Sequence, residues 1–180
     1  MTITAETTMG SIMEQIPGAR RALFARYHLG GCQSCGFSPN ETLGSLCIRN
    51  GDIDPSEMIR HLLAAHEHDQ AVLLSPTEVK ERLSRPLPPV LLDCRTREEH
   101  DAVTIPQSLF LTQELQQQLF SQDPQQEIIL FDHQGNHALD TCAWFHGHGM
   151  KNTFVMRGGI DAWSREIEPS LPRYQLEIPT

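Results

Sequence analysis

The second half of the chain alternates short apolar runs with helical segments, and this alternation leaves few architectures open. Each apolar run is a few residues long and rich in aliphatic or β-branched residues, as buried strands are. The expected strands span 72–74, 90–94, 108–111, 127–131 and 153–156. The expected helices span 75–83, 95–100, 112–121, 138–147 and the residues after 159. Strands that alternate with helices predict a parallel α/β sheet of five strands with helices on both faces.

The first part of the chain carries helical signals only. Its first predicted helix places apolar residues at i, i+3, i+4 and i+7, namely Met9, Ile12, Met13 and Ile16. Asn40 is expected to cap a helix over 41–49, and Asp54 a helix that begins at Pro55. Residues 66–69 indicate a polar hinge, and no internal repeat is apparent. A small all-α domain is therefore expected before the α/β domain.

Composition narrows the classes of function for these two expected domains, 1–69 and 70–180. The chain has a formal net charge of −9 and no cluster of Lys and Arg, which argues against a nucleic-acid partner. No apolar run approaches the roughly 18 residues that span a bilayer, and residues 1–8 lack the pattern of a secretory signal. We therefore expect no membrane partner and a cytoplasmic location. The five cysteines are then expected to be reduced thiols, metal ligands or redox groups.

A tight loop, 132–137, joins the fourth expected strand to the helix that follows it. Gly135 and Asn136 in this loop tolerate a positive φ angle. A strand, a tight loop and a helix in this order direct backbone N–H groups and the positive end of the helix dipole at one point. Such a loop can hold an anion or activate a nucleophile, and the residue at its start is Asp132.

Cys32 and Cys35 form a C-x-x-C pair at an expected turn between helices. Such a pair serves as a reversible disulfide, as half of a metal site or as two ligands of a cluster. Together with Cys47 the first domain holds three cysteines, so a four-ligand zinc or iron–sulfur site needs a further ligand. That ligand could come from His28, a second chain or a small molecule. Cys47 is alternatively a small buried residue on a helix.

The remaining thiols and imidazoles are expected to be structural. Cys94 lies in a predicted core strand and Cys142 in a predicted helix, where both favour packing roles. Histidines near a helix C-terminus favour solvated capping over metal binding. These histidines are His146 and His148, and a looser group with the same expectation is His61, His66 and His68.

The first domain resembles a helical redox-disulfide domain over residues 3–66. The resemblance is to the domain of unknown function of the 1858 type, which is found associated with hybrid-cluster proteins. The segments that carry it are Ile16–Ala19, Tyr27–Gly30, Cys32–Gly36 and Glu41–Leu43. It implies a redox, iron–sulfur or nitrosative context with Cys32 and Cys35 at the matching positions.

The second domain resembles the rhodanese family over residues 71–174. The matching segments are Ser75–Val79, Leu91–Arg95, Glu98–His100, Ile105–Pro106, Ile128–Phe131 with its loop, and Gly158–Trp163. The family carries a cysteine as the first loop residue, which accepts a sulfane sulfur as a persulfide, and here Asp132 stands at that position. His137 replaces the basic residue at the far end of the loop, and Thr104 and Gln107 depart from the family's His-Ile-Pro-Gly pattern. The resemblance implies a catalytically degenerate loop over Asp132, His133, Gln134, Gly135, Asn136 and His137.

Three roles are open for Asp132 on chemical grounds. It could form an acyl phosphate, but no neighbouring pair of Asp residues is apparent that would hold magnesium. It could bind a metal together with His133 and His137. The third interpretation is preferred: the carboxylate occupies the anion site itself and caps the following helix.

These observations predict a cytoplasmic protein with a C-x-x-C module fused to a rhodanese-like domain without classical thiosulfate sulfurtransferase activity. Its expected role is binding or regulation in sulfur, redox or iron–sulfur metabolism, with a protein partner and a possible homodimer. The alternative is a sulfurtransferase or sulfur carrier that uses Cys32 and Cys35 as its persulfide or redox-disulfide site. The cofactor is left open: an iron–sulfur cluster or zinc is a candidate, held by Cys32 and Cys35 with Cys47 as a further candidate ligand.

Overall fold

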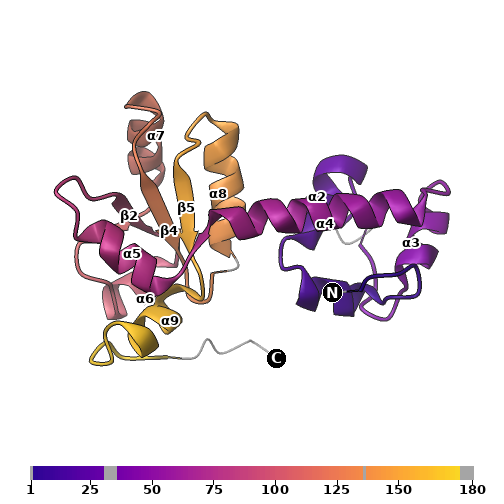
Figure 1. Ribbon diagram of the computed structural model, residues 1–180, viewed down its shortest axis with the longest axis horizontal. Helices are drawn as coiled ribbons and strands as arrows, with labels where there is room; N and C mark the ends of the chain where they lie inside the picture. Colours follow the sequence, from indigo (N-terminus) through magenta and orange to yellow (C-terminus); the bar gives the residue numbers. More distant parts are fainter. Residues whose placement is uncertain (1, 31–35, 136, 175–180) are drawn as a thin grey trace. The chain divides into compact units, whose positions relative to one another are not determined.

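The computed structural model describes residues 2–30, 36–135 and 137–174. The chain divides into two compact units, Met1–Ala71 and Val72–Thr180. Figure 1 shows helices in the first unit and a sheet flanked by helices in the second. The predicted fold class is confirmed: a helical N-terminal region precedes a five-stranded parallel sheet.

The helices of the first unit enclose an apolar core. They are α1 (Met9–Gln15), α2 (Ala19–Tyr27), α3 (Leu43–Arg49) and α4 (Pro55–Val72). The expected apolar face of α1 is confirmed, because Met9, Ile12 and Ile16 are fully buried. They pack with residues from all of the other three helices, including Leu23, Leu43, Leu46, Met58 and Leu62.

A short sequence repeat, which sequence reasoning missed, organises the starts of α1 and α3. Each helix begins with Thr-x-Gly-Ser, at Thr8 and at Thr42. The two threonines form an antiparallel bridge, and each caps its own helix by accepting a hydrogen bond from the serine N–H three residues on. A Cβ on Gly10 would lie 3.0 Å from the carbonyl oxygen of Pro39, so the repeated glycine permits this close backbone approach. The expected Asn40 cap is therefore wrong, since α3 begins after Thr42.

The polar segment 66–69 is helical rather than a hinge, and α4 continues through it to Val72. Asp69 accounts for the difference. Its side chain is buried and accepts a hydrogen bond from the Arg21 guanidinium at 2.5 Å, so this turn of α4 has a fixed tertiary contact. The expected start of α4 is confirmed: Asp54 accepts a hydrogen bond from the Ser56 N–H at 2.9 Å, with Pro55 as the first helical residue.

The sheet of the second unit is parallel throughout, with the strand order β1-β5-β4-β2-β3. The strands are β1 (Leu73–Leu74), β2 (Val90–Asp93), β3 (Leu109–Phe110), β4 (Ile128–Phe131) and β5 (Thr153–Met156). The helices are α5 (Pro76–Leu83), α6 (Arg97–Ala102), α7 (Gln113–Ser121), α8 (His137–Gly147) and α9 (Gly159–Glu166). All four residues of β4 are fully buried, as expected for the middle strand of a covered sheet.

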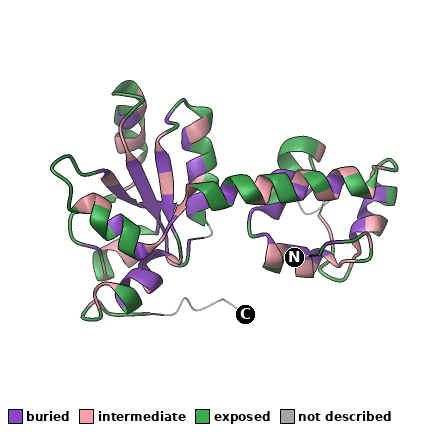
Figure 2. Ribbon diagram, in the orientation of Figure 1, coloured by how far each residue is buried: buried purple, intermediate pink, exposed green. Residues whose placement is uncertain are grey.

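Helices pack on both faces of this sheet, and Figure 2 shows the buried strands between them. One apolar cluster joins Leu119 of α7 and Phe145 of α8 to the sheet. The other joins Val79 of α5 with Ile160 and Trp163 of α9 to the opposite face. Each fully buried side chain of this size contributes about 1.5–3 kcal/mol of transfer free energy. These two layers fix the positions of the loops at the carboxyl ends of the strands.

Candidate functional site

The loop between β4 and α8 places Asp132 against two backbone donors. Asp132 is 5% exposed, and its Oδ1 accepts a very short hydrogen bond from the N–H of Gly135. Its Oδ2 accepts a second hydrogen bond from the N–H of Ala138, in the first turn of α8, at 3.0 Å. The carboxylate therefore satisfies donors that a bound anion would otherwise use.

The backbone of the same loop is tied to the start of α9. The carbonyl oxygen of Asp132 accepts from the Ile160 N–H at 2.9 Å, and that of His133 accepts from the Asp161 N–H at 3.2 Å. Gly159 has a φ of 57°, and a Cβ there would lie 2.3 Å from the Asp132 carbonyl oxygen. A side chain at Gly159 would thus displace the loop, so the glycine is required for this docking.

The other side chains of the loop have different surroundings. His133 is half-buried, and its ring lies 4.5 Å from that of Tyr174, centroid to centroid. Gln134 and His137 are exposed, and Asn136 lies outside the described residues. Within 2–30, 36–135 and 137–174, no three His, Cys, Asp or Glu side chains gather as a metal site. Asp132, His133 and His137 therefore do not converge on one point as a ligand set.

Cys94 is a thiol beside this loop that sequence reasoning placed only in the core. Its N–H donates to the carbonyl oxygen of Phe131 at 2.8 Å, which puts the ends of β2 and β4 side by side. Burial, and then the nearby carboxylates of Asp132 and Asp93, raise the pKa of the Cys94 thiol. Because only a thiolate is strongly nucleophilic, the raised pKa makes Cys94 a weak nucleophile. The adjacency of β2 and β4 was the signal that could have located it.

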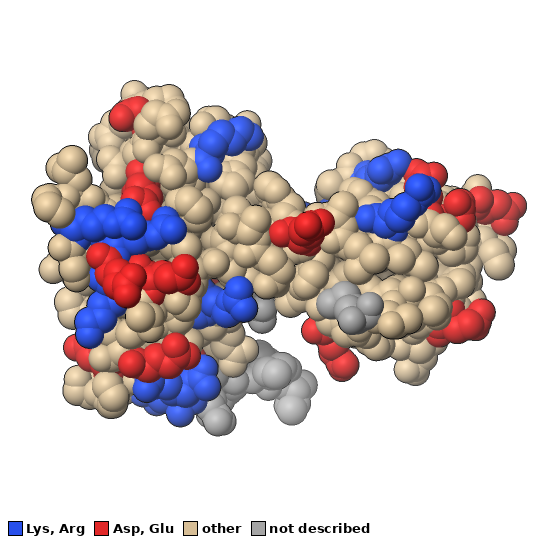
Figure 3. All heavy atoms as spheres, in the orientation of Figure 1, with Lys and Arg blue, Asp and Glu red and all other residues tan. Residues whose placement is uncertain are grey.

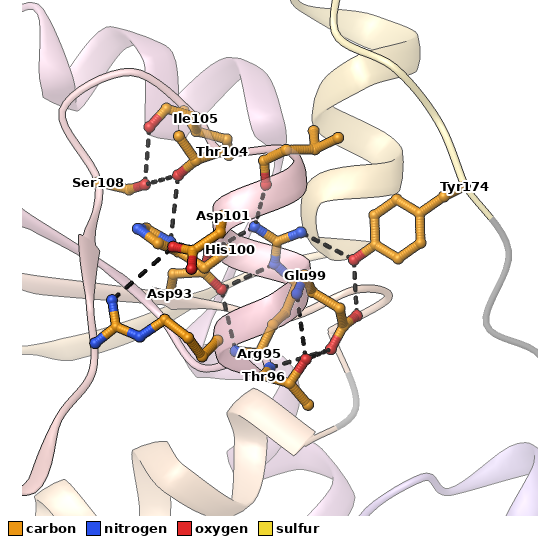
Figure 4. A network of polar contacts seen from close by, with 12 residues as sticks. Asp93, Arg95, Thr96, Glu99, His100, Asp101, Thr104, Ile105, Ser108 and Tyr174 are labelled. Carbon is orange, nitrogen blue, oxygen red and sulfur yellow. Dashed lines mark hydrogen bonds and ion pairs between the residues drawn. The ribbon is translucent and has the colours of Figure 1, made fainter.

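A buried polar network lies at the same end of the sheet, around Asp93 and Arg95 (Figure 4). The carboxylate of Asp93 accepts from Arg95 Nε at 2.9 Å and from Arg95 Nη2 at 2.5 Å, while Nδ1 of His100 lies 2.8 Å from Asp93 Oδ2. The hydroxyl of Tyr174 accepts from Arg95 at 2.9 Å and donates to Glu99 at 2.8 Å. Burial raises the pKa of Tyr174 to about 12, and the hydrogen bond to Glu99 acts in the same direction.

This network is not a hydrolase triad, although it contains Asp93, His100 and Thr104. In a triad the two imidazole nitrogens separate the acid from the nucleophile. Here the Asp93 oxygen and the Thr104 hydroxyl, at 3.4 Å, both approach the same nitrogen, Nδ1. The geometry assigns the group a structural role in holding the β2–α6 turn.

The first unit contains the other predicted site, and its two central residues, Cys32 and Cys35, lie outside the described residues. Cys47 is fully buried, and its sulfur lies 3.7 Å from that of Met58. Burial raises the pKa of Cys47, which opposes the ionised form that a metal ligand needs. This supports the packing role for Cys47. His28, the other proposed ligand, ends α2 in a left-handed conformation with a φ of 56°.

Arginine side chains hold both residues that flank the undescribed segment 31–35. Arg20 Nη1 donates to the carbonyl oxygen of Gly30 at 3.2 Å, and its guanidinium lies 4.9 Å from the centroid of the Phe37 ring. Arg49 Nη2 donates to the carbonyl oxygen of Gly36 at 3.1 Å. Two cations are thus fixed at the boundaries of the segment that carries the C-x-x-C pair.

The remaining histidines and Cys142 bond within the fold. Nε2 of His146 lies 3.0 Å from the carbonyl oxygen of Thr153, and Nδ1 of His148 lies 2.9 Å from that of Trp144 in the last turns of α8. Nε2 of His61 lies 2.9 Å from the carbonyl oxygen of Ala22. The expected packing role of Cys142 is confirmed, because it is 2% exposed in the core beneath α8.

On the face that Figure 3 shows, basic and acidic side chains are interspersed. In the part of the chain that the structure describes, no helix is long and apolar enough to cross a membrane.

Comparison with known proteins identifies the class to which this parallel α/β unit belongs. The model of the rhodanese-like domain matches residues 75–166. The chain therefore belongs to the rhodanese-like domain family, and the resemblance of its second domain to that family is confirmed. No curated protein matches the chain.

Solved structures of rhodanese-like proteins match part of the chain at low sequence identity. A rhodanese-like domain protein from Staphylococcus aureus is 20% identical, with a TM-score of 0.46, and the match covers 57% of this chain and 98% of that one. A rhodanese-related protein from Thermoplasma volcanium is 20% identical, with a TM-score of 0.45 and coverage of 53% and 93%. A human single-domain sulfurtransferase is 22% identical, with a TM-score of 0.45 and coverage of 53% and 96%.

Proposed function

We propose that the rhodanese-like domain of this protein is catalytically degenerate and serves in binding or regulation within sulfur, redox or iron–sulfur metabolism. The observation that carries the proposal is the pairing of the buried Asp132 carboxylate with the N–H groups of Gly135 and Ala138. A carboxylate oxygen cannot carry a sulfane sulfur, and its negative charge opposes the entry of thiosulfate. Cys94 offers no substitute, because its raised pKa keeps the thiol protonated.

Sulfur loading of the loop tests this proposal directly. The wild-type chain and Asp132→Cys are incubated with thiosulfate, and the peptide that contains residue 132 is examined by mass spectrometry. In the variant, a thiolate would attack the outer sulfur of thiosulfate, the sulfur–sulfur bond would break, and sulfite would leave with the electron pair. We expect one added sulfur on the variant peptide and none on the wild-type peptide. A folded Asp132→Cys protein that takes up no sulfur would show that this loop does not stabilise a persulfide.

We further propose that the N-terminal unit is a C-x-x-C module of the 1858 type, with Cys32 and Cys35 as its redox or metal-binding residues. The support is the C-x-x-C spacing of Cys32 and Cys35 in the sequence, between Gly30 and Gly36, whose carbonyl groups accept hydrogen bonds from Arg20 and Arg49. Two thiols at this spacing can bind one metal ion or form a reversible disulfide. A cluster or zinc shared by two chains would complete a four-ligand site in a homodimer.

Anaerobic purification followed by metal analysis and a visible spectrum tests the metal-binding form of this module. The proposal expects bound iron or zinc that is lost in Cys32→Ser and Cys35→Ser and retained in the control Cys94→Ser. Metal-free protein that nevertheless folds would exclude a resident metal. The module could instead act as a cytoplasmic sulfur carrier or redox disulfide that docks on a protein partner. Persulfide trapping at Cys32 and Cys35 tests this alternative. Unmodified Cys32 and Cys35 after exposure to a sulfur donor would contradict it.

A further inference from the structure

The segment after α9, Glu168–Tyr174, returns to the loop that contains Asp132 and is called the strap here. A hydrogen bond to α9 restrains the first residue of the strap, because the Glu168 N–H donates to the carbonyl oxygen of Trp163 at 3.1 Å. Leu171 and Tyr174 pack against the apolar cluster on the α5 and α9 face of the sheet. Arg173 donates to Asp161 at 2.7 Å. Tyr174 bonds to Arg95 and Glu99, and Figure 4 shows these two contacts. The strap is thus held at both ends.

An unsatisfied imidazole nitrogen lies where the strap meets the loop. The ring of Tyr174 lies 4.5 Å from that of His133, and Nδ1 of His133 is buried without a hydrogen-bond partner among the described residues. A buried polar atom without a hydrogen-bond partner raises the free energy of the closed arrangement. This free-energy cost is removed when water or a ligand bonds to that atom. The closed strap therefore hides a hydrogen-bonding group next to the site.

The polar partners of Arg173 and Tyr174 keep another contact when these two side chains are displaced. Arg95 still donates to Asp93 and, at 2.6 Å, to the carbonyl oxygen of Val103. The second carboxylate oxygen of Glu99 still accepts from the N–H and the hydroxyl of Thr96. Asp161 still has the Arg165 guanidinium at 3.4 Å. Release of the strap would therefore not dismantle the network beneath it.

We propose that Glu168–Tyr174 is a conformational strap that closes over His133, and that its release exposes the His133 imidazole. The strap is closed by the Tyr174 hydroxyl between Arg95 and Glu99 and by the Arg173–Asp161 ion pair. This inference does not depend on the absence of sulfur transfer, because it concerns only access to His133.

Chemical modification of histidines tests the strap. The full chain is treated with diethyl pyrocarbonate, and the rate of modification of His133 is followed by peptide mass spectrometry. We expect slow reaction in the wild type and a rate about tenfold higher in Tyr174→Phe, because a hydrogen bond to a charged partner contributes about that factor to closure. Tyr174→Ala should react faster still. Arg165→Ala is the matched control, since it removes a cation from Asp161 but leaves the strap, and it should match the wild type.

His61 in the first unit gives an internal reference, and its rate should be the same in all four proteins. A cooperative urea transition like that of the wild type shows that each variant is folded, and Tyr174→Phe carries the test if Tyr174→Ala does not fold. Equal His133 rates in the wild type and Tyr174→Phe would overturn the proposal. It would also be overturned if Arg165→Ala raised the rate as much as the strap variants do.

Discussion

Replacement of Asp132 by alanine should destabilise the rhodanese-like domain and create an anion site in the same step. The variant loses both carboxylate oxygens that accept from Gly135 and Ala138, in a loop where Asp132 is only 5% exposed. An unsatisfied buried donor costs about 1–3 kcal/mol, and the loss of a helix cap about 0.5–2 kcal/mol. Because water will relieve part of this cost, we expect the free energy of unfolding to fall by about 2–4 kcal/mol.

Urea unfolding followed by tryptophan fluorescence measures this change in the relevant domain. The two tryptophans of the chain, Trp144 and Trp163, both lie in the second unit, and Trp163 is 6% exposed in its core. With a slope of about 1–3 kcal/mol per molar urea, the midpoint should fall by about 1–2 M. The control Asp101→Ala removes an exposed carboxylate 4.0 Å from Arg97 and should change stability by less than about 0.5 kcal/mol.

Phosphate should then rescue Asp132→Ala selectively, because an anion can occupy the two donors that the carboxylate has left. At roughly 100 times its dissociation constant a ligand adds about 2.7 kcal/mol to the stability of the folded state. The comparison is made against sodium chloride at equal ionic strength, and the wild type should gain no such increment. An unchanged midpoint in Asp132→Ala, or equal phosphate effects on both proteins, would refute the idea that Asp132 fills an anion site.

Three further predictions follow from backbone conformation and from shifted pKa values. Gln107 has a φ of 69°, a left-handed conformation that costs a non-glycine residue about 1–2 kcal/mol. The variant Gln107→Gly should therefore raise the unfolding free energy by about 0.5–1 kcal/mol in the same urea assay. Cys94 should react slowly with iodoacetamide at pH 8 and faster in Asp132→Asn, since one of the carboxylates that raise its pKa is then neutral; equal rates would contradict this assignment. Tyr174 has a pKa of about 12 in the folded protein against 10 for the free side chain, so the folded state binds more protons between these values. Stability should be retained below pH 10 and lost as the pH rises toward 12, and Tyr174→Phe should abolish that part of the loss in pH-dependent unfolding.

Local sequence patterns predicted the structure correctly where no contact with a distant residue competed with them. The spacing of Ser75 and Glu78 is that of a capping box, and the structure has one there, because each side chain bonds the backbone N–H of the other residue. The alternation of apolar runs and helices similarly predicted the parallel sheet, since a strand buried on both faces needs a continuous apolar run. At Asn40 two candidate caps compete within three residues, and the pairing of Thr42 with Thr8 decides between them.

The contacts of the site depended on residues far apart in the chain, and no local pattern encodes them. Tyr174 reaches Arg95 and Glu99 across most of the domain, and Cys94 meets the Asp132 loop only because β2 and β4 are neighbours. The sequence placed Asp132 at the start of a loop with backbone donors, but the identity of those donors required the fold. The burial of Asp69, which keeps 66–69 helical, likewise rests on a partner in α2.

The central claim is that Asp132 occupies the anion site of this loop and does not take part in catalysis. The most direct test is an assay of sulfur transfer from thiosulfate to cyanide. We expect the loop to contribute no formation of thiocyanate above the uncatalysed rate. Any turnover by the purified protein should therefore be unchanged in Asp132→Ala and lost in Cys32→Ser or Cys35→Ser. Turnover that Asp132→Ala abolishes in a folded protein, while Cys32→Ser and Cys35→Ser retain it, would contradict the account.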